Sequence, residues 1–166
     1  MLRRWRPADV PPLIDAIRAS MPQLRPWMFW AVDFTDQVAV DFVNGSEQKW
    51  EQGEAYKYGL FDDAGATLGS VNLMARIGPG ALELGYWVRT SHTGRGIAGR
   101  AARLVTSAGL ALPQVGAVEA HIDRANAASA RMVQRIGFTL AGSRQTEITS
   151  PGQTGVTMVW RRNRNT

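Results

Sequence analysis

The fold is decided by LELGYWVRTSHTGRGIAGRAARLV, residues 82–105, where a strand pattern, a glycine loop and a helix pattern follow one another. Within it, GRGIAG (94–99) matches the G-x-G-x-x-G motif of dinucleotide-binding turns. Glycines let the backbone approach a phosphate closely, and the N–H groups at a helix N-terminus favour an anion. The stretch therefore predicts a phosphate-containing ligand, and the rest of the chain has to identify it.

The length and composition favour one cytoplasmic domain over residues 1–166. A chain of this length buries a core without metal or disulfide staples, and it has no cysteine. Disulfides, thiolate zinc sites and a cysteine acyl-enzyme are therefore excluded, and no metal site is predicted. No signal peptide and no apolar run of about 18 residues is present, so no membrane association is expected.

The charge is basic, with 19 Lys and Arg against 14 Asp and Glu. RRNR at 161–164 is the basic block that stands out. It lacks the interleaved aromatic residues of a nucleic-acid arm, so it is interpreted as a solvated tail. No direct nucleic-acid partner is expected.

The first half of the chain predicts a strand and two helical regions. LRRWR (2–6) has strand character, and a helix is expected to open at Asp9. The segment 20–30 is expected to break at its prolines. A second helical region is expected over 36–52, capped by Thr35.

Apolar alternation and turn residues predict six further strands and two further helices. One helix follows the glycine loop over 97–108, and another covers 126–137 with Asn126 as N-cap and Gly137 just after its end. The first three strands form an antiparallel meander. The predicted strands are 55–61, 67–74, 81–88, 115–122, 138–148 and 154–160.

Two phosphate ligands compete for the loop. NAD is supported by Glu119, which lies about where a ribose-binding acid is expected. Against it, three strands precede the motif, and RTSHT (89–93) separates the motif from its strand. The 44 residues after Ile122 are too few for the second half of a doubly wound fold. NAD is therefore disfavoured.

The pattern instead resembles the GCN5-related N-acetyltransferase (GNAT) superfamily. Residues 82–105 resemble its strand, pyrophosphate loop and helix, and NAASARMVQRIGFTLAG (126–142) resembles its Asn-x-x-Ser helix and the strand that follows. LRPWMFW (24–30) and ELGYW (83–87) favour the RimJ/RimL-type subgroup, which acetylates ribosomal proteins. The resemblance implies an α/β (α+β) acyl-CoA N-acyltransferase fold, with a mixed, mostly antiparallel sheet of six or seven strands flanked by helices.

The resemblance implies acetyl-CoA as co-substrate, held by a splayed strand and by the loop. Gly85 is expected to mark a bulge. The family's loop usually opens with Gln or Arg where this chain has Thr93, so one side-chain contact is expected to be lost. The implied cofactor-binding residues are Trp87 and Val88 on the strand, Gly94, Arg95, Gly96, Ile97 and Ala98 in the loop, and Asn126.

Three residues are candidates for catalysis. Ser129 shares a helical stripe with Met132, and the resemblance implies that it protonates or hydrogen-bonds the CoA sulfur; bonding to a backbone carbonyl one turn back is the alternative. Glu147 matches a glutamate that RimL-like enzymes place over the acceptor amine, so the resemblance favours it as the base that deprotonates the amine. Glu83 is a second base or the orienter of Glu147, and either role requires that burial raises the pKa of the carboxyl group. An ordinary surface role for each acid stays open.

The remaining polar and aromatic candidates receive structural interpretations. His92 and His121 are interpreted as structural or surface histidines. Aromatic residues of the first half are assigned mostly to the core, with some lining the acceptor groove.

The predicted function is transfer of acetyl from acetyl-CoA directly to a primary amine, above all a protein N-terminus. A small-molecule amine or antibiotic is the alternative acceptor, and a non-catalytic CoA- or nucleic-acid-binding module is the alternative of another class. The likeness to the RimL type makes a homodimer a reasonable expectation.

Overall fold

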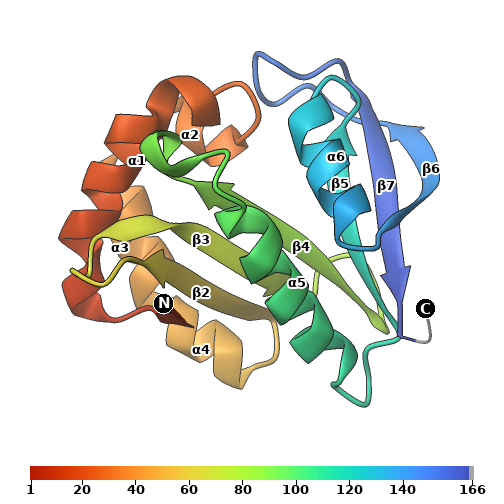
Figure 1. Cartoon of the computed structure of the whole chain (residues 1–166), viewed down its shortest axis with the longest axis horizontal. Coiled ribbons are helices and arrows are strands. Elements are labelled where there is room, and N and C mark those ends of the chain that lie inside the picture. The colour runs from red at the N-terminus through yellow and green to blue at the C-terminus, as the bar shows by residue number, and fades with distance from the viewer. Residues whose placement is uncertain (165–166) are drawn as a thin grey trace.

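In the computed structural model, which describes residues 1–164, the strands form one seven-stranded sheet in the order β1-β2-β3-β4-β5-β7-β6 (Figure 1). The strands are β1 (Leu2–Arg4), β2 (Ala55–Phe61), β3 (Thr67–Met74), β4 (Ala81–Val88), β5 (Ala117–Asp123), β6 (Thr139–Gln145) and β7 (Val156–Asn163). The helices are α1 (Val10–Leu24), α2 (Phe29–Val32), α3 (Asp36–Asn44), α4 (Ser46–Glu51), α5 (Ile97–Leu110) and α6 (Ala127–Arg135), with short 3-10 turns at Pro7–Asp9 and Thr90–His92.

The predicted meander is confirmed, because β2, β3 and β4 have the expected bounds and pair antiparallel. The sheet is mixed because β4 and β5 are parallel, with α5 connecting them. Their pairing starts at Ala81 and ends where Glu83 faces Glu119. Beyond that point the two strands diverge, and this opens a V in the middle of the sheet (Figure 1).

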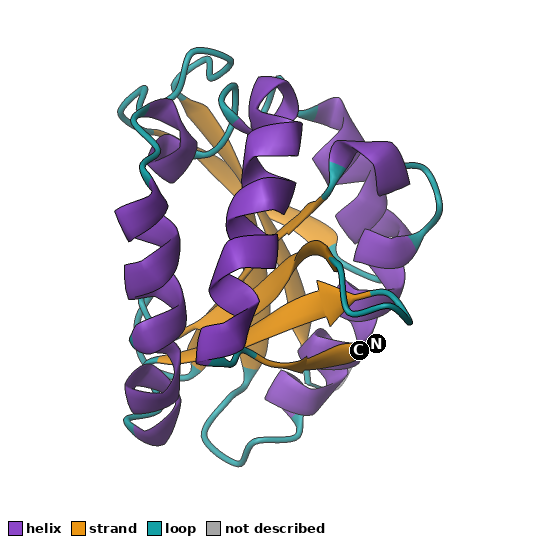
Figure 2. Ribbon diagram, turned by 90° about the vertical axis from the view of Figure 1, so that its left-hand side faces the viewer, coloured by secondary structure: helices purple, strands orange, loops and turns teal. Residues whose placement is uncertain are grey.

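Helices cover both sides of the strands and enclose two apolar cores (Figure 2). One core packs α5 and α6 on residues such as Val71, Leu84 and Val118. The other packs α1 and α3 on Phe61 and Trp87 from the opposite face. The diverging part of β4 therefore lies between two rigid layers, and none of the helices over residues 1–164 is long and apolar enough to cross a membrane.

The N-terminal helices differ from the prediction in three ways. α1 continues through Pro22 and ends at Leu24. Pro22 has no N–H group and therefore costs the helix one hydrogen bond near its end, and burial of the Leu24 side chain in the core offsets that cost. The single helix expected over 36–52 is two helices, α3 and α4. The Ser46 hydroxyl donates to the Phe42 carbonyl, which competes with the backbone hydrogen bonds that would make the helix continuous. Residue Thr35 precedes α3, but its side chain makes no capping hydrogen bond.

The C-terminal hairpin also corrects the prediction. β6 ends at Gln145, three residues before the expected end, and β7 continues to Asn163. The expected solvated tail is therefore largely part of the sheet. Arg161 pairs with Glu119, and Arg164 donates to the carbonyl of Leu110 at 3.0 Å and to several neighbouring carbonyls.

α6 shows the capping that its sequence predicts. The Ser129 N–H donates to the Asn126 side chain at 3.2 Å. At the other end Gly137 has φ of +94°, which favours glycine, and its N–H donates to the Gln134 carbonyl. The Phe138 N–H donates to the Val133 carbonyl, which completes a Schellman motif. This fixes both ends of the helix that carries Ser129.

Candidate active site

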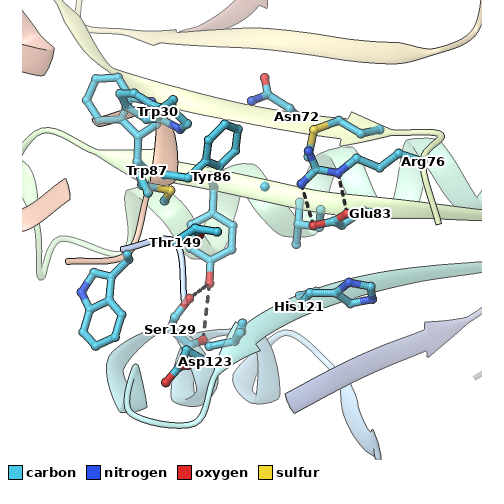
Figure 3. Close-up of a pocket in the computed structure, with 18 of the residues that line it drawn as sticks. Trp30, Asn72, Arg76, Glu83, Tyr86, Trp87, His121, Asp123, Ser129 and Thr149 are labelled. Carbon is cyan, nitrogen blue, oxygen red and sulfur yellow. Dashed lines mark hydrogen bonds and ion pairs between the residues drawn. The ribbon is translucent and has the colours of Figure 1, made fainter. Parts of the chain in front are cut away.

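A cavity of about 580 Å³ lies at the divergence of β4 and β5. Its lining comes from both sides of the sheet. One end contains residues from β4, β5, α6 and the β6–β7 loop, and the other contains aromatic residues of the N-terminal helices together with polar residues of β2 and β3 (Figure 3). The cavity is therefore continuous from the β4–β5 gap to the N-terminal helices.

The glycine loop presents unpaired backbone N–H groups at the N-terminus of α5. Gly94 and Gly96 have φ values of +74° and +72°, and Gly96 is the N-cap. A Cβ built at Gly94 would meet nothing within 4 Å, so the loop is open. Within residues 1–164, the N–H groups of 94–98 donate no hydrogen bond to protein. This arrangement can bind a phosphate group through several N–H donors and the helix dipole.

The residues around the loop brace it from both sides. The Thr93 hydroxyl donates to the Thr90 carbonyl at 2.9 Å, so the position where the family usually has Gln or Arg stabilises the turn. The Arg100 guanidinium donates to the Arg95 carbonyl at 3.1 Å. Both contacts are local to the loop, and they support its shape without occupying its N–H groups.

The diverging edge of β4 is continuous, without the bulge expected at Gly85. Gly85 pairs with Asn72, and the register with β3 runs unshifted from Gly69 to Met74. The glycine gives the Met74 side chain room to lie over it, because a Cβ there would lie 3.0 Å from the Met74 methyl group. Trp87 and Val88 have buried side chains, and they lie on the part of β4 that has left β5. The splay is produced by the end of the β4–β5 pairing.

Tyr86 and Ser129 form a hydrogen-bonded pair across the gap (Figure 3). The Tyr86 side chain reaches from β4 to the Ser129 hydroxyl on α6, and both residues line the cavity. Burial raises the pKa of Tyr86 to about 12, and the hydrogen bond with Ser129 opposes this only in part. Tyr86 therefore stays protonated at neutral pH and can hold or supply a proton at the Ser129 oxygen.

Tyr86 is the site residue that sequence reasoning missed. In the strand alternation it falls on the same side as Leu82 and Leu84, which are core residues. The only indication in the sequence that Tyr86 has a polar partner was the inward-facing hydroxyl predicted for Ser129 on the later helix. Ser129 itself is oriented toward Tyr86, where the sequence left open a bond to the preceding helical turn.

Glu83 is held by Arg76 at the other side of the cavity. Two hydrogen bonds of 2.6 and 2.9 Å join the Arg76 guanidinium to both carboxylate oxygens (Figure 3). Bidentate pairing of this kind stabilises the ionised carboxylate and fixes its orientation. Glu83 is consequently fixed in place by its ion pair, and Arg76 is a second cavity residue that the sequence did not indicate.

Glu147 lines the cavity from the loop between β6 and β7, where a strand was predicted. It is exposed, so the burial on which its predicted role as base depended is absent. Its carboxylate makes no hydrogen bond or ion pair with residues 1–164. The loop is tethered by Asp123, whose carboxylate accepts from Thr154 N–H at 2.8 Å. Burial works against ionisation of Asp123, but hydrogen bonds from Ala125, Thr154 and Gly155 outweigh it and lower its pKa.

The two histidines are hydrogen-bonded, as predicted for structural residues. His121 Nε2 lies 2.8 Å from the Glu119 carboxylate, and the Arg144 guanidinium donates to its Nδ1 at 3.2 Å. His92 lies 2.9 Å from the Ser91 hydroxyl. Glu119, the acid considered for an NAD ribose, is occupied by His121 and Arg161, so the structure does not support that role.

The end of the cavity beneath the N-terminal helices is apolar and aromatic, with a cationic edge. The Trp30 and Trp87 rings pack against each other in a tilted arrangement, with ring centroids 6.3 Å apart. Lys49 and Lys57 line the same region from α4 and β2. Sequence reasoning assigned part of the aromatic set to this groove but identified neither lysine.

Comparisons with known proteins agree with this geometry. The model of the family described as the acetyltransferase (GNAT) domain matches residues 1–139. Comparison with curated proteins gave no match. Among solved structures, RimL, a ribosomal L7/L12 alpha-N-protein acetyltransferase in complex with coenzyme A, is 21% identical with a TM-score of 0.87, over 98% of this chain and 92% of that chain.

Two further solved structures share the fold. RimJ from Mycobacterium smegmatis, in complex with CoA-disulfide, is 21% identical with a TM-score of 0.84, over 98% of this chain and 80% of that chain. The microcin C7 self-immunity acetyltransferase MccE, in complex with acetyl-CoA and AMP, is 17% identical with a TM-score of 0.87, over 98% and 91%. The predicted mixed sheet flanked by helices is confirmed, and with the family match over most of its length the chain belongs to the acetyltransferase (GNAT) domain family.

Proposed function

We propose that this protein transfers acetyl from acetyl-CoA directly to a primary amine, above all to the N-terminal amine of a protein. The observation that carries the proposal is the combination of two features. The β4–β5 gap is lined by the Tyr86–Ser129 pair, and the loop from Gly94 to Ala98 has free N–H groups. A phosphate-bearing thioester fits both features. RimL and RimJ, which share the fold, were solved with coenzyme A or its disulfide.

Acetyl-CoA would supply an activated acyl group at the cavity and a diphosphate for the loop. The N–H groups of 94–98 bind the diphosphate, and backbone groups of Trp87 and Val88 on the unpaired edge of β4 hydrogen-bond the pantetheine amides. Asn126 caps α6 beside the same gap and lines the cavity. These contacts position the thioester next to Ser129.

The protons move through residues on opposite sides of the acceptor. Glu147 accepts a proton from the ammonium group, directly or through a water, which leaves a neutral amine to attack the acyl carbon. As the carbon–sulfur bond breaks, the Ser129 hydroxyl donates its proton to the leaving sulfur and takes one from Tyr86, and the second proton released by the acylated nitrogen returns to Tyr86 through water, so that the products are the amide and the free CoA thiol. Glu83 and Arg76 orient the acceptor rather than exchange protons with it, because the carboxylate is already paired.

A protein N-terminus is the favoured acceptor because the cavity continues beneath α1, α2 and α3, where an extended peptide fits. RimL supports this choice, as a fold relative whose name is that of a ribosomal L7/L12 alpha-N-protein acetyltransferase. A small amine is the second candidate, and MccE, whose structure holds AMP, is the observation that favours it. The predicted homodimer is tested by light scattering coupled to size-exclusion chromatography.

The test combines ligand binding with turnover. We expect acetyl-CoA and CoA to raise the melting temperature, and NADH to leave it unchanged, because a ligand that binds the native state stabilises it. CoA release is then followed with panels of N-terminal peptides and small amines. Release above background with peptides supports the proposal, release with small amines alone changes the acceptor, and no release with either indicates a binding module.

A further inference from the structure

Lys57 is a buried cation without a carboxylate partner. Its residue is 9% exposed, and it lines the cavity from β2. Its Nζ lies 4.1 Å from the centroid of the Phe42 ring and donates to the Phe42 carbonyl at 3.4 Å, which is a long hydrogen bond. Among residues 1–164 no carboxylate forms an ion pair with it. These two contacts replace only part of the hydration that the ammonium group loses on burial.

The other charges that line the cavity form no ion pair with Lys57 within residues 1–164, and the unpaired Glu147 carboxylate is exposed on the β6–β7 loop. Arg76 and Glu83 neutralise each other, and Asp123 is engaged by Thr154. Lys49 adds a second positive charge at the same end. Burial, with a smaller contribution from Lys49, lowers the pKa of Lys57 to about 8, so the ammonium form still predominates at pH 7.

The strand register connects Lys57 to the reaction centre. Lys57 faces Asn72 on β3, and Asn72 faces Gly85 on β4, so the three residues form one row across the sheet. Residues paired in this way share a face, and neighbouring strands lie about 4.8 Å apart, which separates the first and last Cα atoms by roughly 10 Å. Gly85 has no side chain, but the Met74 methyl group lies over it, where a Cβ would be 3.0 Å away, so a chain that follows the row toward the β4–β5 gap would contact Met74.

We propose that Lys57 is the docking point for an acidic side chain of the acceptor, about three residues after the amine that is acetylated. The inference rests on the proposed function and adds the substrate class, N-termini with an early Asp or Glu. An extended chain advances about 3.4 Å per residue, so the span from Gly85 to Lys57 corresponds to about three residues. A carboxylate there would supply the counter-charge that the folded protein lacks.

The experiment compares hexapeptides that differ at one position. The first peptide has Asp at position four, three residues after the acetylated residue, the second has Asn there, and the third has Asp moved to position six. We expect the wild-type kcat/KM for the first peptide to exceed that for the other two by about tenfold, mainly through a lower KM, as for one additional partly buried ion pair. In Lys57→Met the three values should converge to within about twofold.

The matched control is Arg18→Met, which removes one positive charge from α1 outside the cavity. Arg18→Met should keep the full preference for the first peptide. The reason is that the preference comes from the contact with Lys57, and the general attraction of an acidic peptide to a basic protein does not produce it. Equal rates for all three wild-type peptides, or a preference that survives Lys57→Met, would overturn the inference while leaving peptide acetylation intact. If none of the peptides releases CoA above background, the proposed function fails first, and the inference fails with it.

Discussion

The Tyr86 hydroxyl on β4 is hydrogen-bonded to the Ser129 hydroxyl on α6, across the gap where β4 has separated from β5. Tyr86 is nearly buried and has a pKa of about 12, whereas Ser129 is positioned by the cap at Asn126. The two hydroxyls therefore form a short proton chain between the interior and the cavity.

The first prediction concerns this pair. Tyr86→Phe and Ser129→Ala should each lower kcat by about 100-fold, the lower range for loss of general acid catalysis, with little change in the KM for acetyl-CoA. The double variant should be no slower than the slower single one, because the two residues act as one unit. Steady-state kinetics by thiol release measures all three.

Tyr58→Phe is the control for a lost hydroxyl, since Tyr58 is a half-buried β2 residue outside the cavity. Multiplicative effects of Tyr86→Phe and Ser129→Ala would contradict a single proton chain. Wild-type rates in both would remove the pair from the mechanism.

The second prediction concerns the glycine loop. Gly94→Ala should weaken CoA binding at least tenfold, because φ of +74° is unfavourable for alanine and its relief would reorient the N–H groups. Gly65→Ala is the matched control, since Gly65 has φ of +84° and equally open surroundings. Both variants should lose about 1–2 kcal/mol of stability. Isothermal titration calorimetry should show weaker binding only in Gly94→Ala, and equal affinities would exclude the loop as the diphosphate site.

Much of the fold could be predicted because its local signals agree with its tertiary structure. The alternation of 55–61, 67–74 and 81–88 gave three strands with the observed bounds, and Asn126 and Gly137 marked the ends of α6. Errors occurred where a long-range contact decides the local structure. α1 passes Pro22 because Leu24 is buried, which no local pattern shows.

The site was predicted where backbone conformation determines it and missed where side chains meet across elements. Gly94 and Gly96 have the positive φ values that their identity suggested. Tyr86 and Arg76 were not found, because each becomes significant only through a partner on another element or turn, Ser129 and Glu83. Lys57 looked like an ordinary strand residue, since its contact with Phe42 on α3 depends on how two separate elements pack.

The third prediction separates the two carboxylates. Glu147→Gln should lower kcat about 100-fold, as for loss of a general base. Glu83→Gln frees the half-exposed Arg76 guanidinium and should raise the acceptor KM with a smaller effect on kcat. Glu51→Gln, an exposed position outside the cavity, is the control. A greater loss of kcat in Glu83→Gln than in Glu147→Gln would reverse the two roles.

The last prediction is that Lys57 reduces stability at neutral pH. Its pKa falls from 10.5 to about 8 on folding, so below pH 8 the folded chain carries a charge that it disfavours. Each unit of difference corresponds to about 1.4 kcal/mol, so Lys57→Met should be more stable near pH 7 by up to about 3 kcal/mol. As the pH rises from 8 to 10.5, Lys57 of the folded wild type loses its proton before Lys57 of the unfolded chain does. The difference in stability between Lys57→Met and the wild type should therefore shrink toward zero over this range. Urea unfolding near pH 7 and pH 10 measures both values, with Arg103→Met, at an exposed position of α5, as the control. A gain that is absent near pH 7, or that grows toward pH 10, would show that the ammonium group is not disfavoured in the fold.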